Sequence, residues 1–180
     1  KFYSLYYTIT KDEILLSKIK KILNYLCNIQ RSDGSWAYAP YIHYSDSFHT
    51  AFIIEAIAEM MKLVSSVKYE EMFEKGMKNY RDSYILPSGQ PLYIHPQYGN
   101  KGRRKLLEVT KTDIRDCAMA INLFTKCGLE NEATKCLDWT IQNMYSSKGY
   151  FYFYKEKMWT NKIEHARPQG WMLYALSNLF

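Results

Sequence analysis

Residues suited to acid–base chemistry open two apolar stretches of the chain. Ser45-Asp46-Ser47-Phe48-His49-Thr50 precedes one, and Thr112-Asp113-Ile114-Arg115-Asp116 precedes the other. Glycosidic cleavage uses two carboxylates, about 5 Å apart for retention and further apart for inversion. If the two stretches are packed helices, their equivalent residues lie roughly 8–10 Å apart. The spacing therefore favours Asp46 and Asp113 as general acid and base with inversion, or a pairing in which one of them acts with His49. The predicted catalytic residues are Asp46, His49, Asp113 and Asp116.

Polar and aromatic residues gather in the same connecting segments. All four histidines fall in connectors or at the start of a helical stretch. Aromatic rings stack on the C–H face of a sugar while polar groups bind its hydroxyls. The predicted substrate-binding residues are Trp36, Tyr38, His43, Tyr44, His95, Arg115, Tyr152, Tyr154, His165, Arg167 and Gln169.

A structural role is open for each of these residues. Asp46 and Asp113 stand where helix N-caps would stand. Asp116 could favour the helix dipole or pair with Arg115. Trp36 and the tyrosine-rich stretches could pack between neighbouring helical hairpins. A functional role is favoured over a structural one because all of these residues are expected in one region.

The elements that would position these residues are helices that alternate in character. Apolar residues recur on one face in three stretches and on nearly every side in the other three. The first helix begins with the capping-box spacing Thr10 to Glu13, and Gly128 is predicted as a left-handed cap. The predicted helices span about 11–29, 46–64, 68–85, 112–127 and 129–145, with a sixth from Pro168.

The order outer, inner repeats three times, and so do the connectors. Gly34, Gly89 and Gly149 follow the outer helices at separations of 55 and 60 positions, and an aromatic stretch follows each. This pattern predicts an all-α fold, an α/α toroid of three helical hairpins in one domain over 1–180. Its parallel inner helices would gather their N-termini on one face, where unpaired N–H groups would favour an anion. Because a closed ring takes about six hairpins, the open sides predict a missing half or a homo-oligomer partner.

Composition narrows the class of protein. The chain has 180 residues, a formal net charge of +6 and 16% aromatic residues. No apolar run is long enough to span a membrane, and the basic run 101–105 is predicted to be a solvated loop without a nucleic-acid-binding module. The four cysteines lack metal-site or disulfide spacing, so we expect reduced thiols, no metal, no cofactor and a cytoplasmic protein.

The turn Gln30-Arg31-Ser32-Asp33-Gly34-Ser35-Trp36 resembles the QW-type turn of α/α-toroid proteins, which include terpenoid cyclases, protein prenyltransferase β subunits and six-hairpin glycosidase-like enzymes. A family of bacterial and archaeal toroid proteins linked to surface-polysaccharide biosynthesis is more closely similar. The chain resembles the C-terminal half of such proteins. Arg115 stands where that family tends to have a histidine, and Pro168 near a usual aromatic residue. The motifs that carry this similarity are Ser45–Thr50, Thr112–Asp116, Gly149–Tyr154, Asn161–Ile163 and Arg167–Leu176.

These features favour a carbohydrate-active protein acting on a polysaccharide or glycan, anionic or neutral, as a hydrolase or lyase. In a lyase, Arg115 or Arg167 would neutralise a uronate while His49 or a tyrosine removes a proton. A non-catalytic glycan-binding or scaffold toroid and an isoprenoid-binding protein are the alternatives. Terpenoid cyclisation is disfavoured because no DDxxD or DxDD cluster is present, and a zinc prenyltransferase would need a cysteine, for which only Cys117 comes near.

Overall fold

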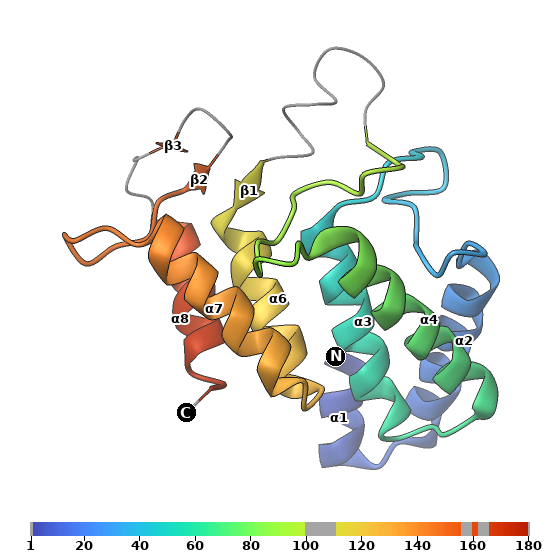
Figure 1. Ribbon diagram of the computed structural model, residues 1–180. Helices are drawn as coiled ribbons and strands as arrows, with labels where there is room; N and C mark the ends of the chain where they lie inside the picture. The colour runs from blue at the N-terminus through green and yellow to red at the C-terminus, as the bar shows by residue number, and fades with distance from the viewer. Residues whose placement is uncertain (1, 100–110, 156–159, 162–165, 180) are drawn as a thin grey trace.

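The computed structural model describes residues 2–99, 111–155, 160–161 and 166–179 (Figure 1). The helices are α1 (Phe2–Thr10), α2 (Glu13–Ile29), α3 (Ser47–Met61), α4 (Val67–Tyr84), α6 (Ile114–Lys126), α7 (Glu130–Met144) and α8 (Ala166–Leu176). Three short strands, β1 (Thr112–Asp113), β2 (Tyr154–Lys155) and β3 (Thr160–Asn161), lie among the connectors. The predicted helices are confirmed to within a few residues at each end.

Inner and outer helices alternate as predicted. Figure 1 shows α3, α6 and α8 running in the same direction, with their N-terminal ends where the connecting segments gather. The helix α6 packs against α3, α7 and α8, and every residue from Asp116 to Phe124 is buried. Because α6 is apolar on nearly every side, it needs packed helices around it, and these three neighbours provide them.

The start of the chain differs from the prediction. The aromatic residues before the first predicted helix form α1, which packs beside α2. The capping box between Thr10 and Glu13 is not formed, because the Thr10 hydroxyl donates to the Tyr6 carbonyl within α1 at 3.0 Å. Asp12 caps α2 instead, accepting a hydrogen bond from the Ile14 N–H at 2.9 Å.

The inner helix α3 is not apolar on every side. Glu55 is 1% exposed, and its carboxylate lies 2.6 Å from the Lys126 ammonium of α6. A buried carboxylate needs such a partner because it has lost its hydration. Phe52 of the same helix is 40% exposed, which leaves an apolar ring on the open side.

A glycine turn follows each outer helix, and two of these turns contact the outer helix of the next hairpin. Gly34, Gly89 and Gly149 have φ of 90°, 88° and 87°, the left-handed region that glycine tolerates. A Cβ on Gly34 would lie 2.3 Å from the carbonyl oxygen of Lys75 in α4, and a Cβ on Gly89 would lie 2.3 Å from that of Lys135 in α7. These two turns thus seat directly on the backbone of the next outer helix.

Connectors of neighbouring hairpins pair with one another. The strand β2 lies between β1 and β3, antiparallel to both, with Asp113 opposite Tyr154. An isolated bridge joins Asp46 to Ile94 in the same way. The residues that begin α3 and α6 are therefore held by backbone from the following connector.

The four cysteines are free thiols, and burial raises the pKa of the Cys117 thiol well above its ordinary value. No helix among the described residues is long and apolar enough to cross a membrane. The basic run 101–105 lies outside the described residues.

Candidate functional site

The first part of the site is the N-terminal turn of α3. Asp46 is the N-cap, and its Oδ1 accepts a hydrogen bond from the His49 backbone N–H at 2.8 Å. The His49 ring returns to the same carboxylate, with Nδ1 2.9 Å from both carboxylate oxygens. The Asp46 side chain is 5% exposed and that of His49 is 53% exposed. The His49 imidazole therefore faces outward from the buried Asp46 carboxylate, and its Nε2 takes no part in their contact.

The second part is the N-terminal turn of α6. Asp113 is the N-cap, accepting from the Arg115 backbone N–H at 2.9 Å. The Arg115 guanidinium binds the same carboxylate with two hydrogen bonds, Nε to Oδ1 at 3.0 Å and Nη2 to Oδ2 at 2.7 Å. Asp116 completes a capping box by accepting from the Asp113 N–H at 3.2 Å. This arrangement raises the pKa of Arg115, chiefly through the hydrogen bond to Asp113.

Asp116 is the buried acid of this turn. Its side chain is 0% exposed, and burial, followed by the charge of Asp113, raises the pKa of its carboxyl well above the ordinary value. Its Oδ1 has no hydrogen-bond partner among the described residues. A neutral carboxylic acid is thus favoured here, because a lone buried charge would be costly.

Tyr93 joins the two turns, although it is not among the predicted substrate-binding residues. Its carbonyl accepts from the Ser47 N–H at 3.0 Å, and its own N–H donates to the Lys111 carbonyl at 2.9 Å. Burial raises the pKa of the Tyr93 phenol, and the nearby charges of Asp116 and Asp46 raise it further. We call Asp46, His49, Tyr93, Asp113, Arg115 and Asp116 the N-cap cluster.

Hydroxyl groups from the outer helix α4 hold the first turn of α3. The Tyr84 hydroxyl lies 2.7 Å from Ser45 Oγ and 3.3 Å from Thr50 Oγ1, and the Tyr80 hydroxyl lies 3.0 Å from Ser47 Oγ. Both tyrosines are fully buried. Such satisfied buried networks fix geometry, so α4 orients the turn that presents Asp46 and His49.

Aromatic rings surround the His49 side of the cluster. Tyr38 stacks on Tyr44 at 4.9 Å and meets the His49 ring edge-on at 4.8 Å. Burial, with a smaller effect of Asp46, raises the pKa of Tyr44 to about 12. The ring centroids of Phe48 and Trp171 of α8 are 5.1 Å apart, so α3 and α8 meet near this end.

Cations lie against rings on the Asp113 side. The Arg115 guanidinium is 5.8 Å from the Phe48 centroid and 5.9 Å from that of Phe153. The Lys111 ammonium is 4.9 Å from the Tyr93 ring and 4.5 Å from the Tyr154 ring. All four distances are within cation–π range.

The N-termini of α3 and α6 do not provide the free N–H groups expected for an anion. The Asp46 and Asp113 carboxylates occupy those positions. Negative caps suit the helix dipole, so an anionic ligand would have to be bound by side-chain cations such as Arg115 and Lys111.

Two predicted substrate-binding residues are buried in the fold and are not part of the N-cap cluster. Trp36 is 1% exposed, donates from Nε1 to the Leu26 carbonyl at 3.0 Å and packs its ring on Gly76. His95 is 3% exposed and has Tyr84 at 5.3 Å, and burial lowers its pKa. Trp36 and His95 therefore have a structural role, the alternative that the sequence left open for each predicted residue.

Gln169 clamps a connector backbone. Its Oε1 accepts from the Phe151 N–H at 2.8 Å, and its Nε2 donates to the Phe151 carbonyl at 2.7 Å. Gln30 does similar work in the first repeat, donating to the carbonyls of Gly34 at 3.0 Å and Met72 at 2.9 Å. The amide of Gln169 is therefore already used within the fold.

The remaining predicted substrate-binding residues are not part of the N-cap cluster or lie outside the described residues. His43 is exposed, and its backbone carbonyl accepts from Arg31 Nη2 at 2.8 Å. Tyr152 is half-buried, with its N–H bonded to the Met144 carbonyl at 2.7 Å. His165 and the side chain of Arg167 lie outside the described residues.

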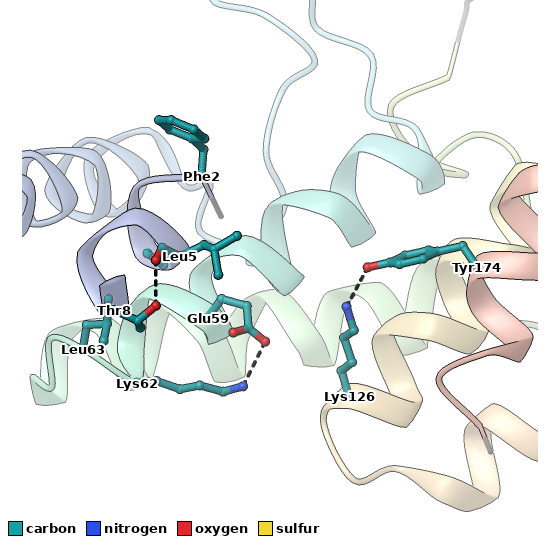
Figure 2. A pocket seen from close by; sticks show the side chains of 9 residues that line it. Phe2, Leu5, Thr8, Glu59, Lys62, Leu63, Lys126 and Tyr174 are labelled. Atoms are coloured by element: carbon teal, nitrogen blue, oxygen red, sulfur yellow. Dashed lines mark hydrogen bonds and ion pairs between the residues drawn. The ribbon is translucent and has the colours of Figure 1, made fainter. Parts of the chain in front are cut away.

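A cavity of about 410 Å³ lies far from this cluster, at the C-terminal end of α3 (Figure 2). Apolar side chains of α1 form one wall, and the ion pair of Lys62 with Glu59 lies on another. Lys126 lies at its edge, bonded to the Tyr174 hydroxyl at 2.8 Å. Within the described residues, no group of three or more His, Cys, Asp or Glu side chains is placed to bind a metal.

Comparison with known proteins identifies the fold. No family model and no curated protein matches the sequence. The α-mannanase of glycoside hydrolase family 76 from Bacteroides thetaiotaomicron is similar in structure, with a TM-score of 0.74 at 11% identity over 98% of this chain and 52% of that one. The chain has the α/α-toroid fold.

Two further solved structures agree. A family 105 glycoside hydrolase of C. acetobutylicum gives a TM-score of 0.68 at 16% identity, over 98% of this chain and 49% of that one. Cellobiose 2-epimerase from Bacillus thermoamylovorans gives 0.67 at 14% identity, over 97% and 49%. This chain spans about half the length of these proteins, and at such identities the likeness concerns the fold alone.

Proposed function

We propose that the protein is an enzyme acting on a polysaccharide or glycan, with His49 as the proton-transferring group and Asp46 as the residue that orients it. The contact of His49 Nδ1 with both Asp46 oxygens at 2.9 Å is the observation that carries this assignment. Toroid structures that act on carbohydrates support the substrate class.

The chemistry of the pair follows from its geometry. A carboxylate at Nδ1 favours the tautomer with the proton on that nitrogen, so the Nε2 lone pair faces outward and can accept a proton. The same ring, once protonated, can return the proton to a leaving group. Asp46 is too buried to contact a polysaccharide directly and acts by holding the ring. A lyase or a hydrolase can use such a group.

The Asp113 side of the cluster would bind rather than transfer protons. Both Asp113 oxygens already accept from Arg115, so this carboxylate is a poor candidate for a direct acid. Arg115 Nη1 has no hydrogen-bond partner among the described residues, and the Arg115 side chain is 27% exposed. It can therefore donate to a sugar hydroxyl or carboxylate.

The rings near the cluster suit a pyranose. Tyr38, Tyr93 and Tyr154 are partly exposed and come from three different connectors. A sugar can stack its C–H face on such rings while its hydroxyls reach polar groups. The ammonium of Lys111, which has no carboxylate within ion-pair distance in the described part of the chain, favours an anionic sugar at the Tyr93–Tyr154 side.

A glycan-binding or scaffold protein of the same fold is the second candidate. It is favoured by one observation, that Asp46 and Asp113 both serve as helix caps. An isoprenoid-binding protein is the third candidate, and it would use an apolar hollow between α1, α2 and α3, which Ile22, Phe52 and Met60 help to line.

The test is turnover of a panel of neutral and uronate-containing oligosaccharides. Reducing-end release reports a hydrolase, and absorbance of an unsaturated product reports a lyase. His49→Ala should lower kcat by about 10²-fold or more, and Asp46→Asn should lower kcat with little change in KM. Lys78→Ala, on the exposed face of α4, serves as a control.

Retention of full turnover by His49→Ala would reject the assignment of His49. Tight binding of a glycan by the wild type without turnover of any panel member would favour the scaffold candidate. Far-ultraviolet circular dichroism on each variant verifies that the helices are intact.

A further inference from the structure

The segment that pairs with the first turn of α3 ends at His95. The His95 N–H donates to the Ser45 carbonyl at 3.0 Å, and the Tyr93 carbonyl accepts from the Ser47 N–H at 3.0 Å. An isolated bridge at Asp46 lies between these two hydrogen bonds. The backbone of residues 93–95 therefore holds the residue that caps α3 and binds the His49 ring.

The imidazole of His95 closes a turn in the same connector. Its Nδ1 accepts a hydrogen bond from the Gln97 backbone N–H at 3.2 Å, and its carbonyl accepts from the Tyr98 N–H at 3.1 Å. A neutral imidazole has one acceptor nitrogen and one N–H, so the proton belongs on Nε2. That nitrogen lies 3.5 Å from the side-chain amide of Asn79 in α4, whose oxygen can accept it. Both ring nitrogens are therefore used, and only the neutral ring suits both contacts.

Protonation of His95 would break the turn. A second N–H on Nδ1 would face the Gln97 N–H, so two donors would meet and the acceptor would be lost. The side chain is 3% exposed and lies beside the rings of Tyr84 at 5.3 Å and Tyr98 at 4.7 Å. A charged imidazole in this place would be poorly hydrated, which adds to its cost.

The charges around His95 leave the neutral ring favoured. Burial is the main reason that the pKa of His95 is lowered; the charge of Asp33 opposes this shift and that of Arg31 adds to it. The Asp33 carboxylate is already bonded to the Tyr98 hydroxyl at 2.8 Å. The other charged side chains of the described residues that line the hollow beside His95 all belong to α4: Lys75, Lys78 and Asp82.

We propose that His95 is a positioning residue for the Asp46–His49 pair, holding it through the backbone of residues 93–95 while the imidazole is neutral and releasing it when the imidazole is protonated. Without the contact to Gln97 the connector is free to move, and the hydrogen bonds from its backbone to Ser45 and Ser47 weaken with it. The catalytic consequence rests on the proposed function; the coupling between the two histidines does not.

The first test compares the pH dependence of stability in wild type and His95→Asn. An asparagine side-chain oxygen can accept from the backbone N–H two residues on, as Nδ1 does here, but it cannot be protonated. Because the pKa of His95 is lower in the folded chain, the unfolded chain binds more protons below about pH 6.5. Wild-type stability is therefore complete above that pH and is lost as the pH falls. Relative to His95→Asn, the unfolding constant of wild type in urea should rise by up to about tenfold per pH unit.

The second test follows the His49 ring by NMR, with its signals identified by their absence in His49→Ala. Titration of His49 itself occurs in every variant, so the comparison with His95→Asn isolates the contribution of His95. In wild type the His49 signals should also change as His95 titrates, and this change should be absent in His95→Asn. His95→Leu has no acceptor for the Gln97 N–H, so it should shift the His49 signals at every pH. It should also lower kcat by about tenfold or more at a pH where His95→Asn retains it.

The outcomes separate this inference from the proposed function. His49 signals that follow His95 in a protein without turnover of any panel oligosaccharide would leave the positioning role intact and remove the enzymatic one. Identical pH dependence of the His49 signals in wild type and His95→Asn would overturn the positioning role, whatever the turnover. Parallel stability curves for these two proteins between about pH 5 and pH 8 would overturn it as well.

Discussion

Alanine at the glycine turns measures how much each joint contributes to stability. All three substitutions place an L-residue in the left-handed region, which costs about 1–2 kcal/mol. At Gly34 and Gly89 the new Cβ would also meet a helix carbonyl oxygen at 2.3 Å, so that helix or turn must move. Overpacking of this kind costs about 1–3 kcal/mol more. We expect Gly89→Ala to lower the free energy of unfolding by about 2–5 kcal/mol. Gly149→Ala should lower it only by the backbone cost of about 1–2 kcal/mol.

Urea unfolding followed by circular dichroism gives the free energies. Gly34→Ala should match Gly89→Ala, because their contacts with the next helix have the same distances. Equal losses at Gly89 and Gly149, with unchanged m-values, would show that the close carbonyl contributes nothing and would refute the reasoning.

Three further perturbations test the site. Tyr84→Phe removes the 2.7 Å contact with Ser45 and should cost about 1–2 kcal/mol in urea unfolding, with a loss in kcat rather than KM. Because the buried Asp116 has a raised pKa, wild type should lose stability relative to Asp116→Asn as pH rises above about 4, by up to about 1.4 kcal/mol per pH unit; parallel stability curves would contradict this. Lys111→Met should remove about tenfold of the preference for uronate over neutral oligosaccharides in calorimetry, whereas Lys155→Met, whose ammonium faces Trp139, should keep it.

Residue type and periodicity were sufficient to predict six of the seven helices of the described residues, together with the N-caps of α3 and α6. Asp46 and Asp113 precede apolar stretches that are too uniformly apolar for an outer position, so both the inner helices and their N-caps follow from local sequence. The helix α1 was missed because it is short and carries aromatic residues on several faces. Packing against α2, rather than intrinsic propensity, stabilises it.

The parts of the site that depend on pairing between repeats were not predictable. Tyr93 reaches the cluster because its backbone bonds to Ser47 and Lys111, which lie 46 and 18 positions away along the sequence. Conversely, Trp36 was predicted to bind substrate because an aromatic residue in a connector can stack on a sugar. Gly76 on the next helix leaves space for that ring, and this space is set by a residue 40 positions later.

The joint between hairpins recognises main chain, not side chains. Lys75 and Lys135 offer only their carbonyl oxygens to the turns, while their side chains extend into solvent. The receiving helix can therefore change its residue at that position without loosening the ring, and only the turn must keep its glycine. A fold assembled through such contacts can drift far in sequence while each hairpin stays in register with the next.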